Sequence, residues 1–195
     1  MKHIILIGFM GCGKSTTGIR LSYRLRRALE DTDKLIEKRA GKSISSIFET
    51  EGEAFFRKME TKCLQELMTL KEERIISTGG GLPMQPENGA LLKRLGTVVY
   101  LRITPEGIWE RLKNDTTRPL LQCEDPLAKV KSLLEVREPV YEALADVILD
   151  VDGKSMETVL TELENKLQAC GCITEDKLAK GDRENEGISY QWTQS

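Results

Sequence analysis

The feature that most constrains this chain is a glycine-rich segment directly after a short apolar run near the N-terminus. The apolar run is Ile4–Ile7, and Gly8–Ser15 follows it with the spacing G-x-x-x-x-G-K-S. This spacing is typical of a P-loop, in which a buried strand ends in glycines, backbone N–H groups surround a polyphosphate and a helix begins. Lys14 adds positive charge, and the Ser15 hydroxyl is the expected magnesium ligand. The segment predicts a nucleoside triphosphate site, with a tight turn that binds no ligand as the alternative.

Length, charge and cysteine usage restrict the class of protein. The 195 residues suit one α/β domain, and 29 Lys and Arg nearly balance 31 Asp and Glu. That balance offers no overall positive field for nucleic acid or an anionic membrane. The apolar runs are too short to span a bilayer, no signal sequence is visible, and five cysteines without a C-x-x-C pair favour reduced thiols. We expect a cytoplasmic monomer that binds small molecules and neither nucleic acid nor membrane.

Two carboxylates follow the next short strand, which is predicted over residues 28–33. Because strand side chains alternate, Asp31 and Asp33 would lie on the same face at the carboxyl end of the strand, where α/β sheets bind ligands. Carboxylates are ligands that Mg²⁺ accepts directly or through water. The alternative is a helix cap, with Thr32 or Asp33 opening a helix over Lys34–Arg39.

A pair of helices is predicted over Ser43–Phe48 and Glu53–Met68. In the second helix, Arg57 and Glu60 lie three residues apart and therefore face the same side. An ordinary surface ion pair is the default interpretation of such a pair. The apolar stripe expected on the second helix consists of Phe55, Phe56, Met59, Cys63, Leu64, Leu67 and Met68.

Three consecutive glycines, Gly79, Gly80 and Gly81, follow a strand predicted over Arg74–Thr78. Glycines in a row cost chain entropy, and the usual reason for them is a close approach of the backbone to a ligand. A flexible turn is the alternative.

Strands and helices alternate along most of the chain. The further segments expected are helices over 15–27, 86–95, 105–113, 127–145 and 155–168, and strands over 97–101 and 147–149. In the first of these helices, Ile19, Leu21 and Leu25 have near-helical spacing. The alternation predicts an α/β fold with a doubly wound, five-stranded parallel sheet in a three-layer α/β/α arrangement.

Two segments depart from this alternation. Residues 114–126 are polar and contain Arg118, and we expect a lid that brings this arginine over the phosphates and excludes water. An ordinary surface loop is the alternative. From residue 171 the chain is polar and charged, so 171–195 is predicted to be a disordered tail after a single domain over 1–170.

Taken together, these motifs resemble those of the shikimate kinase family, in the nucleoside-monophosphate-kinase-like branch of P-loop folds. The resemblance covers about residues 2 to 168. It rests on Gly8–Ser15 with Gly18, Asp31–Asp33, Gly52 and Glu53 with Phe56, Arg57 and Glu60, Thr78–Gly81, Arg118–Leu121, and Arg137 with Pro139 and Tyr141.

The resemblance implies transfer of the ATP γ-phosphoryl group to the 3-hydroxyl of shikimate, on the route to aromatic amino acids, with Mg²⁺ as cofactor. It implies catalytic roles for Lys14, Asp33 and Arg118, and magnesium binding by Ser15 and Asp31. The residues implied for the nucleotide are Gly11, Cys12, Gly13, Lys14, Ser15, Thr16, Arg111 and Arg118. Those implied for shikimate are Asp33, Arg57, Gly79, Gly80, Gly81 and Arg137, with substrate-binding helices over about 32–60.

Other functions would share part of this set of motifs. A gluconate or adenylate kinase of the same branch would leave the glycine run together with Arg57 and Arg137 unexplained. A GTPase is disfavoured because Asn165 and Lys166 are followed by Leu-Gln and not by the x-Asp of the guanine motif. An inactive nucleotide-binding or regulatory module is the alternative from another class. The presence of Lys14, Ser15, Asp31, Asp33 and Arg118 argues against it. The only histidine, His3, precedes the first strand and is expected to be structural.

Overall fold

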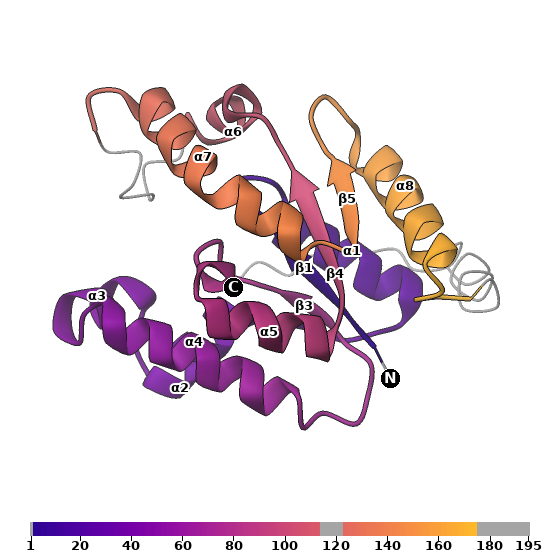
Figure 1. Cartoon of the computed structure of the whole chain (residues 1–195), viewed down its shortest axis with the longest axis horizontal. Helices are drawn as coiled ribbons and strands as arrows, with labels where there is room; N and C mark the ends of the chain where they lie inside the picture. Colours follow the sequence, from indigo (N-terminus) through magenta and orange to yellow (C-terminus); the bar gives the residue numbers. More distant parts are fainter. Residues whose placement is uncertain (1, 114–122, 175–195) are drawn as a thin grey trace, which may run out of the picture.

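The computed structural model of this chain describes residues 2–113 and 123–174 (Figure 1). Its strands are β1 (His3–Ile7), β2 (Leu29–Asp31), β3 (Ile75–Ser77), β4 (Gly96–Arg102) and β5 (Val147–Asp150). The helices are α1 (Lys14–Leu25), α2 (Thr32–Ala40), α3 (Ile44–Thr50), α4 (Glu53–Leu67), the 3-10 turn η1 (Leu82–Met84), α5 (Pro86–Leu95), α6 (Pro105–Leu112), α7 (Pro126–Leu144) and α8 (Met156–Ala169). The strands form one parallel sheet in the order β2-β3-β1-β4-β5, which confirms the predicted α/β fold.

The centre of the sheet is β1, whose apolar run is covered from both sides. Ile4, Ile5, Leu6 and Ile7 are all 0% exposed. Helices α1 and α8 pack together on one face, whereas α5 and α7 cover β4 from the other (Figure 1). Burial on both faces explains why this strand is a continuous run of apolar residues. The strand therefore delivers the glycine-rich segment at the middle of the sheet's carboxyl edge.

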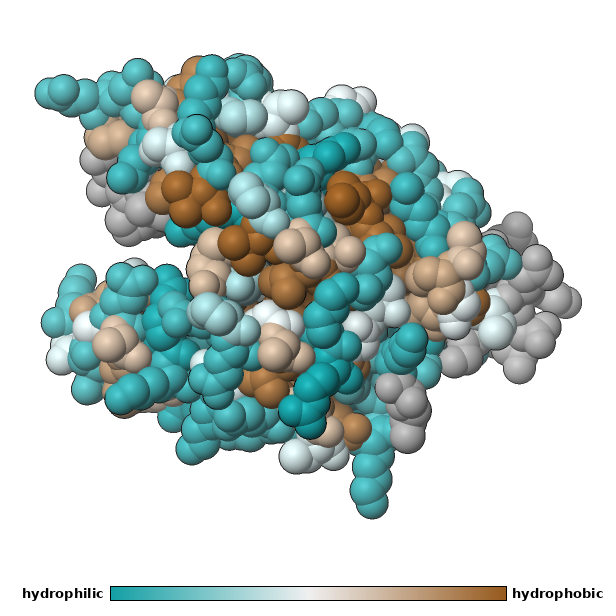
Figure 2. All heavy atoms as spheres, in the orientation of Figure 1, coloured by the Kyte–Doolittle hydropathy of each residue, from teal (hydrophilic) through white to brown (hydrophobic). Residues whose placement is uncertain are grey.

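Two groups of helices extend beyond the sheet. Helices α2, α3 and α4 pack against one another, and α6 packs against α7. In Figure 2 these groups form two arms at the left of the molecule, with a notch between them. The described residues contain no helix with both the length and the apolar composition that a membrane crossing requires.

Two predicted core residues are exposed. Ile19 on α1 is 45% exposed and Phe55 on α4 is 41% exposed. Each residue lies one position away from the stripe of residues that its helix buries. The buried residues are Thr17, Gly18, Leu21 and Leu25 in α1, and Phe56, Glu60, Cys63, Leu64 and Leu67 in α4. One residue corresponds to about 100° of rotation on a helix, so each side chain is turned toward solvent.

Residues near both ends of the described chain are buried in the fold. His3 is buried, and its Nδ1 accepts a hydrogen bond of 3.0 Å from Arg74 N, which confirms its structural role. The predicted disordered tail begins too early at residue 171, because Ile173 is 3% exposed and packs into the core. Most of the predicted tail, 175–195, and most of the predicted lid, 114–122 with Arg118, lie outside the described residues.

Candidate active site

The glycine-rich segment forms a tight loop between β1 and α1. Gly8, Gly11 and Gly13 have φ angles of 140°, 76° and 95°, which residues other than glycine rarely adopt. The Lys14 ammonium donates hydrogen bonds of 2.8 Å to Gly8 O and 2.9 Å to Phe9 O. The lysine charge is therefore held over the loop, at the N-terminus of α1, where an anion is favoured.

A hydroxyl and a carboxylate meet beside this loop. Ser15 Oγ lies 3.3 Å from Asp31 Oδ2. Among residues 2–113 and 123–174, no group of three His, Cys, Asp or Glu side chains could hold a metal ion. Mg²⁺ does not require such a group, because it is bound through one or two carboxylates, water and substrate phosphates. An oxygen pair next to a phosphate loop therefore fits this ion.

The structure corrects the prediction for Asp31 and Asp33. Strand β2 ends at Asp31, which is the N-cap of α2, and its Oδ1 accepts hydrogen bonds from Asp33 N and Lys34 N. Asp33 belongs to the first turn of α2, so the two carboxylates do not share a strand face. An aspartate that satisfies two free N–H groups at a helix start is a strong cap, and this stops the strand.

A cleft of about 490 Å³ runs along the carboxyl edge of the sheet. It is lined by Gly11, Cys12, Gly13, Lys14, Ser15, Thr16, Asp31, Asp33, Gly79, Gly80 and Arg111, all of them predicted site residues. Arg111 donates to Gly11 O at 3.2 Å and to Val151 O at 2.9 Å, and so ties the loop to the segment after β5. Lys154 and Met156 also line this cleft, and no motif in the sequence identified them.

The three glycines lie against site side chains. A Cβ on Gly79 would be 2.5 Å from Asp33 Oδ1, and one on Gly81 would be 2.7 Å from Arg57 Nη1. A Cβ on Gly80 would lie between the P-loop and α7, at 3.4 Å from Gly8 O and 3.8 Å from Arg137 Nη1. At distances below 3.0 Å, the end of the Asp33 or Arg57 side chain would have to move aside for a Cβ. Gly79 and Gly81 therefore pack closely against Asp33 and Arg57, respectively.

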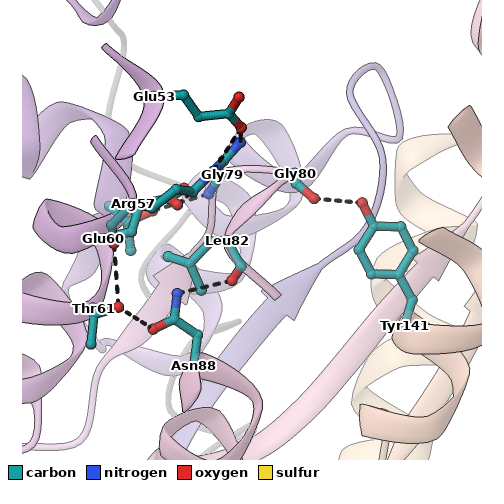
Figure 3. A network of polar contacts seen from close by, with 10 residues as sticks. Glu53, Arg57, Glu60, Thr61, Gly79, Gly80, Leu82, Asn88 and Tyr141 are labelled. Atoms are coloured by element: carbon teal, nitrogen blue, oxygen red, sulfur yellow. Dashed lines mark hydrogen bonds and ion pairs between the residues drawn. The ribbon is translucent and has the colours of Figure 1, made fainter. Parts of the chain in front are cut away.

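Arg57 and Glu60 form the ion pair that their spacing predicted, at 2.8 Å between Nη1 and Oε2 (Figure 3). Arg57 also pairs with Glu53 at 2.8 Å. Glu60 is 1% exposed, and its burial raises its pKa to about 7, although the Arg57 charge opposes this rise. Burial alone would lower the pKa of Arg57, but Glu60 and Glu53 outweigh it and raise the pKa. Arg57 thus remains a cation at the edge of the glycine turn.

Other side chains fix the turn and its surroundings. The Tyr141 hydroxyl donates a 2.6 Å hydrogen bond to Gly80 O, and Thr32 Oγ1 accepts one of 3.0 Å from Gly79 N. The Arg137 guanidinium lies over the Phe9 ring, 5.3 Å from its centre. The role of Thr32 could not be found from the sequence, because its partner is 47 residues away.

This combination defines a class of enzyme. A P-loop with its lysine and serine shares a cleft with an aspartate, and arginines lie around the glycine turn beside it, as in a P-loop kinase for a small acceptor. Residues 10–168 match the model of the family described as "Shikimate kinase". The chain therefore belongs to the shikimate kinase family, and it is an enzyme of the kinase class.

Individual relatives agree with this assignment. The chain is 41% identical over 171 residues to a shikimate kinase of Burkholderia lata, which covers 88% of this chain and 92% of the relative. The structure is similar to that of a shikimate kinase from Acinetobacter baumannii in complex with shikimate, with a TM-score of 0.81, 36% identity and coverage of 87% and 94%. It is also similar to the Aquifex aeolicus shikimate kinase, with a TM-score of 0.76, 41% identity and coverage of 87% and 98%.

Proposed function

We propose that this chain transfers the γ-phosphoryl group of ATP to the 3-hydroxyl of shikimate, giving shikimate 3-phosphate and ADP. One observation carries the proposal. The Gly79–Gly81 turn packs against all three of Asp33, Arg57 and the P-loop. A small acceptor bound there would therefore lie next to the terminal phosphate of a nucleotide. The similar structure from Acinetobacter baumannii is a shikimate kinase in complex with shikimate, which supports the choice of acceptor.

At the acceptor end, each charged group has a role suited to its chemistry. Arg57 and Arg137 would bind the carboxylate of shikimate, because the planar guanidinium matches a carboxylate better than an ammonium does. Asp33, in the first turn of α2, would bind the substrate hydroxyls. The backbone of the Gly79–Gly81 turn would allow the ring to come close.

At the nucleotide end, the P-loop residues Gly11–Thr16 would surround the phosphates, with Lys14 as their main cation. Ser15 and Asp31 would hold Mg²⁺, which when bound neutralises charge on the phosphates. We propose that Arg111 lies against the adenine and that Arg118 closes over the phosphates from the lid, 114–126.

The reaction then requires positioning more than covalent chemistry. The oxygen of the 3-hydroxyl attacks the γ-phosphorus as the bond from that phosphorus to the ADP oxygen breaks, and the hydroxyl proton passes to the Asp33 carboxylate. Lys14 stabilises the charge on the transferred group. Holding the two substrates in line supplies much of the rate enhancement.

We further propose that the chain acts as a monomer in the cytoplasm. Its catalytic domain would be 1–170, with substrate-binding helices over about 32–60, and 171–195 would be a tail without a catalytic part. The balanced composition supports a small-molecule enzyme, because it offers no overall field for nucleic acid or an anionic membrane.

A coupled assay of ADP release tests the proposed function. We expect turnover of ATP with shikimate at least about a hundredfold above the rate with gluconate or AMP. Gluconate carries its carboxylate and hydroxyls on an open chain, which does not hold them as a ring does, and AMP has no carboxylate for the arginines. The control is ATP without an acceptor. Equal rates with all acceptors, or none with shikimate, would contradict the proposal.

A further inference from the structure

A chain of polar contacts lies behind the glycine turn, on the side away from the phosphate loop (Figure 3). Asn88 on α5 is 0% exposed and donates a 3.0 Å hydrogen bond through Nδ2 to Leu82 O. Thr61 on α4 donates to Asn88 Oδ1 at 2.7 Å. Leu82 follows the three glycines directly, and Thr61 lies one helical turn after Arg57.

The direction of these hydrogen bonds is fixed by their chemistry. A carbonyl oxygen can only accept, so the Asn88 NH₂ group must face Leu82 O and its Oδ1 must face Thr61. The Thr61 hydroxyl has a single proton, and the short contact to Oδ1 uses it. The same hydroxyl lies 3.2 Å from Arg57 O. One buried amide therefore joins the backbone of the turn to the helix that carries Arg57 and Glu60.

The position of this link matters for the acceptor site. Leu82 closes the turn, because Leu82 N donates to Gly79 O at 3.2 Å, and the Arg57 guanidinium packs against Gly81. A shift of α4 relative to the turn would change the distance between Arg57 and the glycine backbone. Tyr141 fixes the turn from the opposite side through Gly80 O.

We propose that Asn88 and Thr61 are positioning residues for the acceptor site: their hydrogen-bonded link holds the Gly79–Gly81 turn and the Arg57 side chain in register. This inference rests on the proposed function, because it takes the turn and Arg57 as the place where the acceptor binds. Neither residue touches the cleft that holds the phosphate loop. Their loss should therefore affect the acceptor and spare the nucleotide.

The first test replaces Thr61 by Val, which keeps the shape and removes the donor. Asn88 Oδ1 then lacks its short contact inside the protein, and we expect Thr61→Val to raise KM and the calorimetric Kd for shikimate about five- to tenfold, with Kd for ATP within about twofold. Thr61→Ser restores the hydroxyl and should restore both values. The matched control is Thr69→Val, because the exposed Thr69 hydroxyl donates to Glu66 O in the turn after α4.

A second variant keeps the test decisive. In Asn88→Leu the amide is lost, so adding Thr61→Val to it should weaken shikimate binding by less than about twofold further. A lower melting temperature with unchanged shikimate binding, or Thr61→Val losses equal for both substrates, would overturn the inference. If the unaltered chain does not turn over shikimate, the proposed function fails instead, which the same assay reports separately.

Discussion

Asp33 Oδ1 lies 2.5 Å from the position that a Cβ on Gly79 would occupy, although 46 residues separate the two in the chain. The glycine is explained by this contact and not by an unusual φ, since Gly79 is not among the residues with positive φ. The α2 helix start and the turn after β3 are thus built around one carboxylate.

The contact predicts the effect of Gly79→Ala. The added methyl group would meet the end of the Asp33 side chain, so Asp33 should shift, at a cost of no more than about 1 kcal/mol in the free energy of unfolding. Shikimate turnover should fall by at least about tenfold, with ATP affinity little changed. Gly80→Ala is the comparison, because its nearest neighbour would be 3.4 Å away and its stability should be nearly normal. Equal destabilisation of both variants would contradict the packing argument.

Arg137→Ala should separate the two substrates. The guanidinium lies over Phe9 and close to Gly80, beside the glycine turn at which we propose that the acceptor binds. Loss of a charge-assisted hydrogen bond should lower kcat/KM for shikimate by about tenfold to a hundredfold, and leave Kd for ATP within about twofold. Arg94→Ala, at an exposed position on α5, serves as the control. If Arg137→Ala weakens both substrates equally, the residue does not belong to the acceptor site.

Asp31→Asn tests the magnesium site apart from the helix cap. Asparagine caps a helix about as well as aspartate, so the free energy of unfolding should change by less than about 1 kcal/mol. The lost charge should raise the Mg²⁺ concentration for half-maximal activity by about tenfold. Asp31→Ala removes both functions and should also lower stability. An unchanged Mg²⁺ requirement in Asp31→Asn would exclude the residue from metal binding.

Glu60 makes stability depend on pH. Its pKa is raised from 4.5 to about 7 by burial, so the native state binds this proton more tightly than the unfolded chain does. Protonation of Glu60 therefore contributes to the free energy of unfolding. This contribution is fully present below pH 4.5 and is lost as the pH rises toward 7, by an amount on the order of 1–3 kcal/mol. Glu60→Gln cannot titrate, so its free energy of unfolding in urea should fall less over this interval. Parallel pH profiles for the two proteins would show that Glu60 does not titrate there.

Much of the fold could be predicted because its signals are local. The apolar run of β1, the glycines of the P-loop and the proline that opens α5 lie next to the structures they specify, and α5 has the predicted bounds Pro86–Leu95. The pairing of Arg57 with Glu60 also followed from helical spacing alone.

The remaining features depend on partners distant in the chain. The predicted strand through Asp33 was wrong because Asp31 caps α2, and an Asp-Thr-Asp segment is compatible with both structures. Asn88 pairs with Thr61 across 27 residues, so no spacing rule could reveal the link. Ile19 and Phe55 are exposed because a rotation of one residue about the helix axis decides which side is buried. That rotation is set by the elements against which each helix packs, which are strands for α1 and other helices for α4.

The central claim is that the chain phosphorylates the 3-hydroxyl of shikimate with Asp33 as the group that orients it. Phosphorus NMR of the product, with correlation to the ring protons, tests this most directly. We predict one molecule of shikimate 3-phosphate for each ADP, formed at least about a hundredfold more slowly by Asp33→Asn while ATP binding is retained. Free phosphate, a phosphate on another hydroxyl, or near-normal turnover by Asp33→Asn would contradict the account.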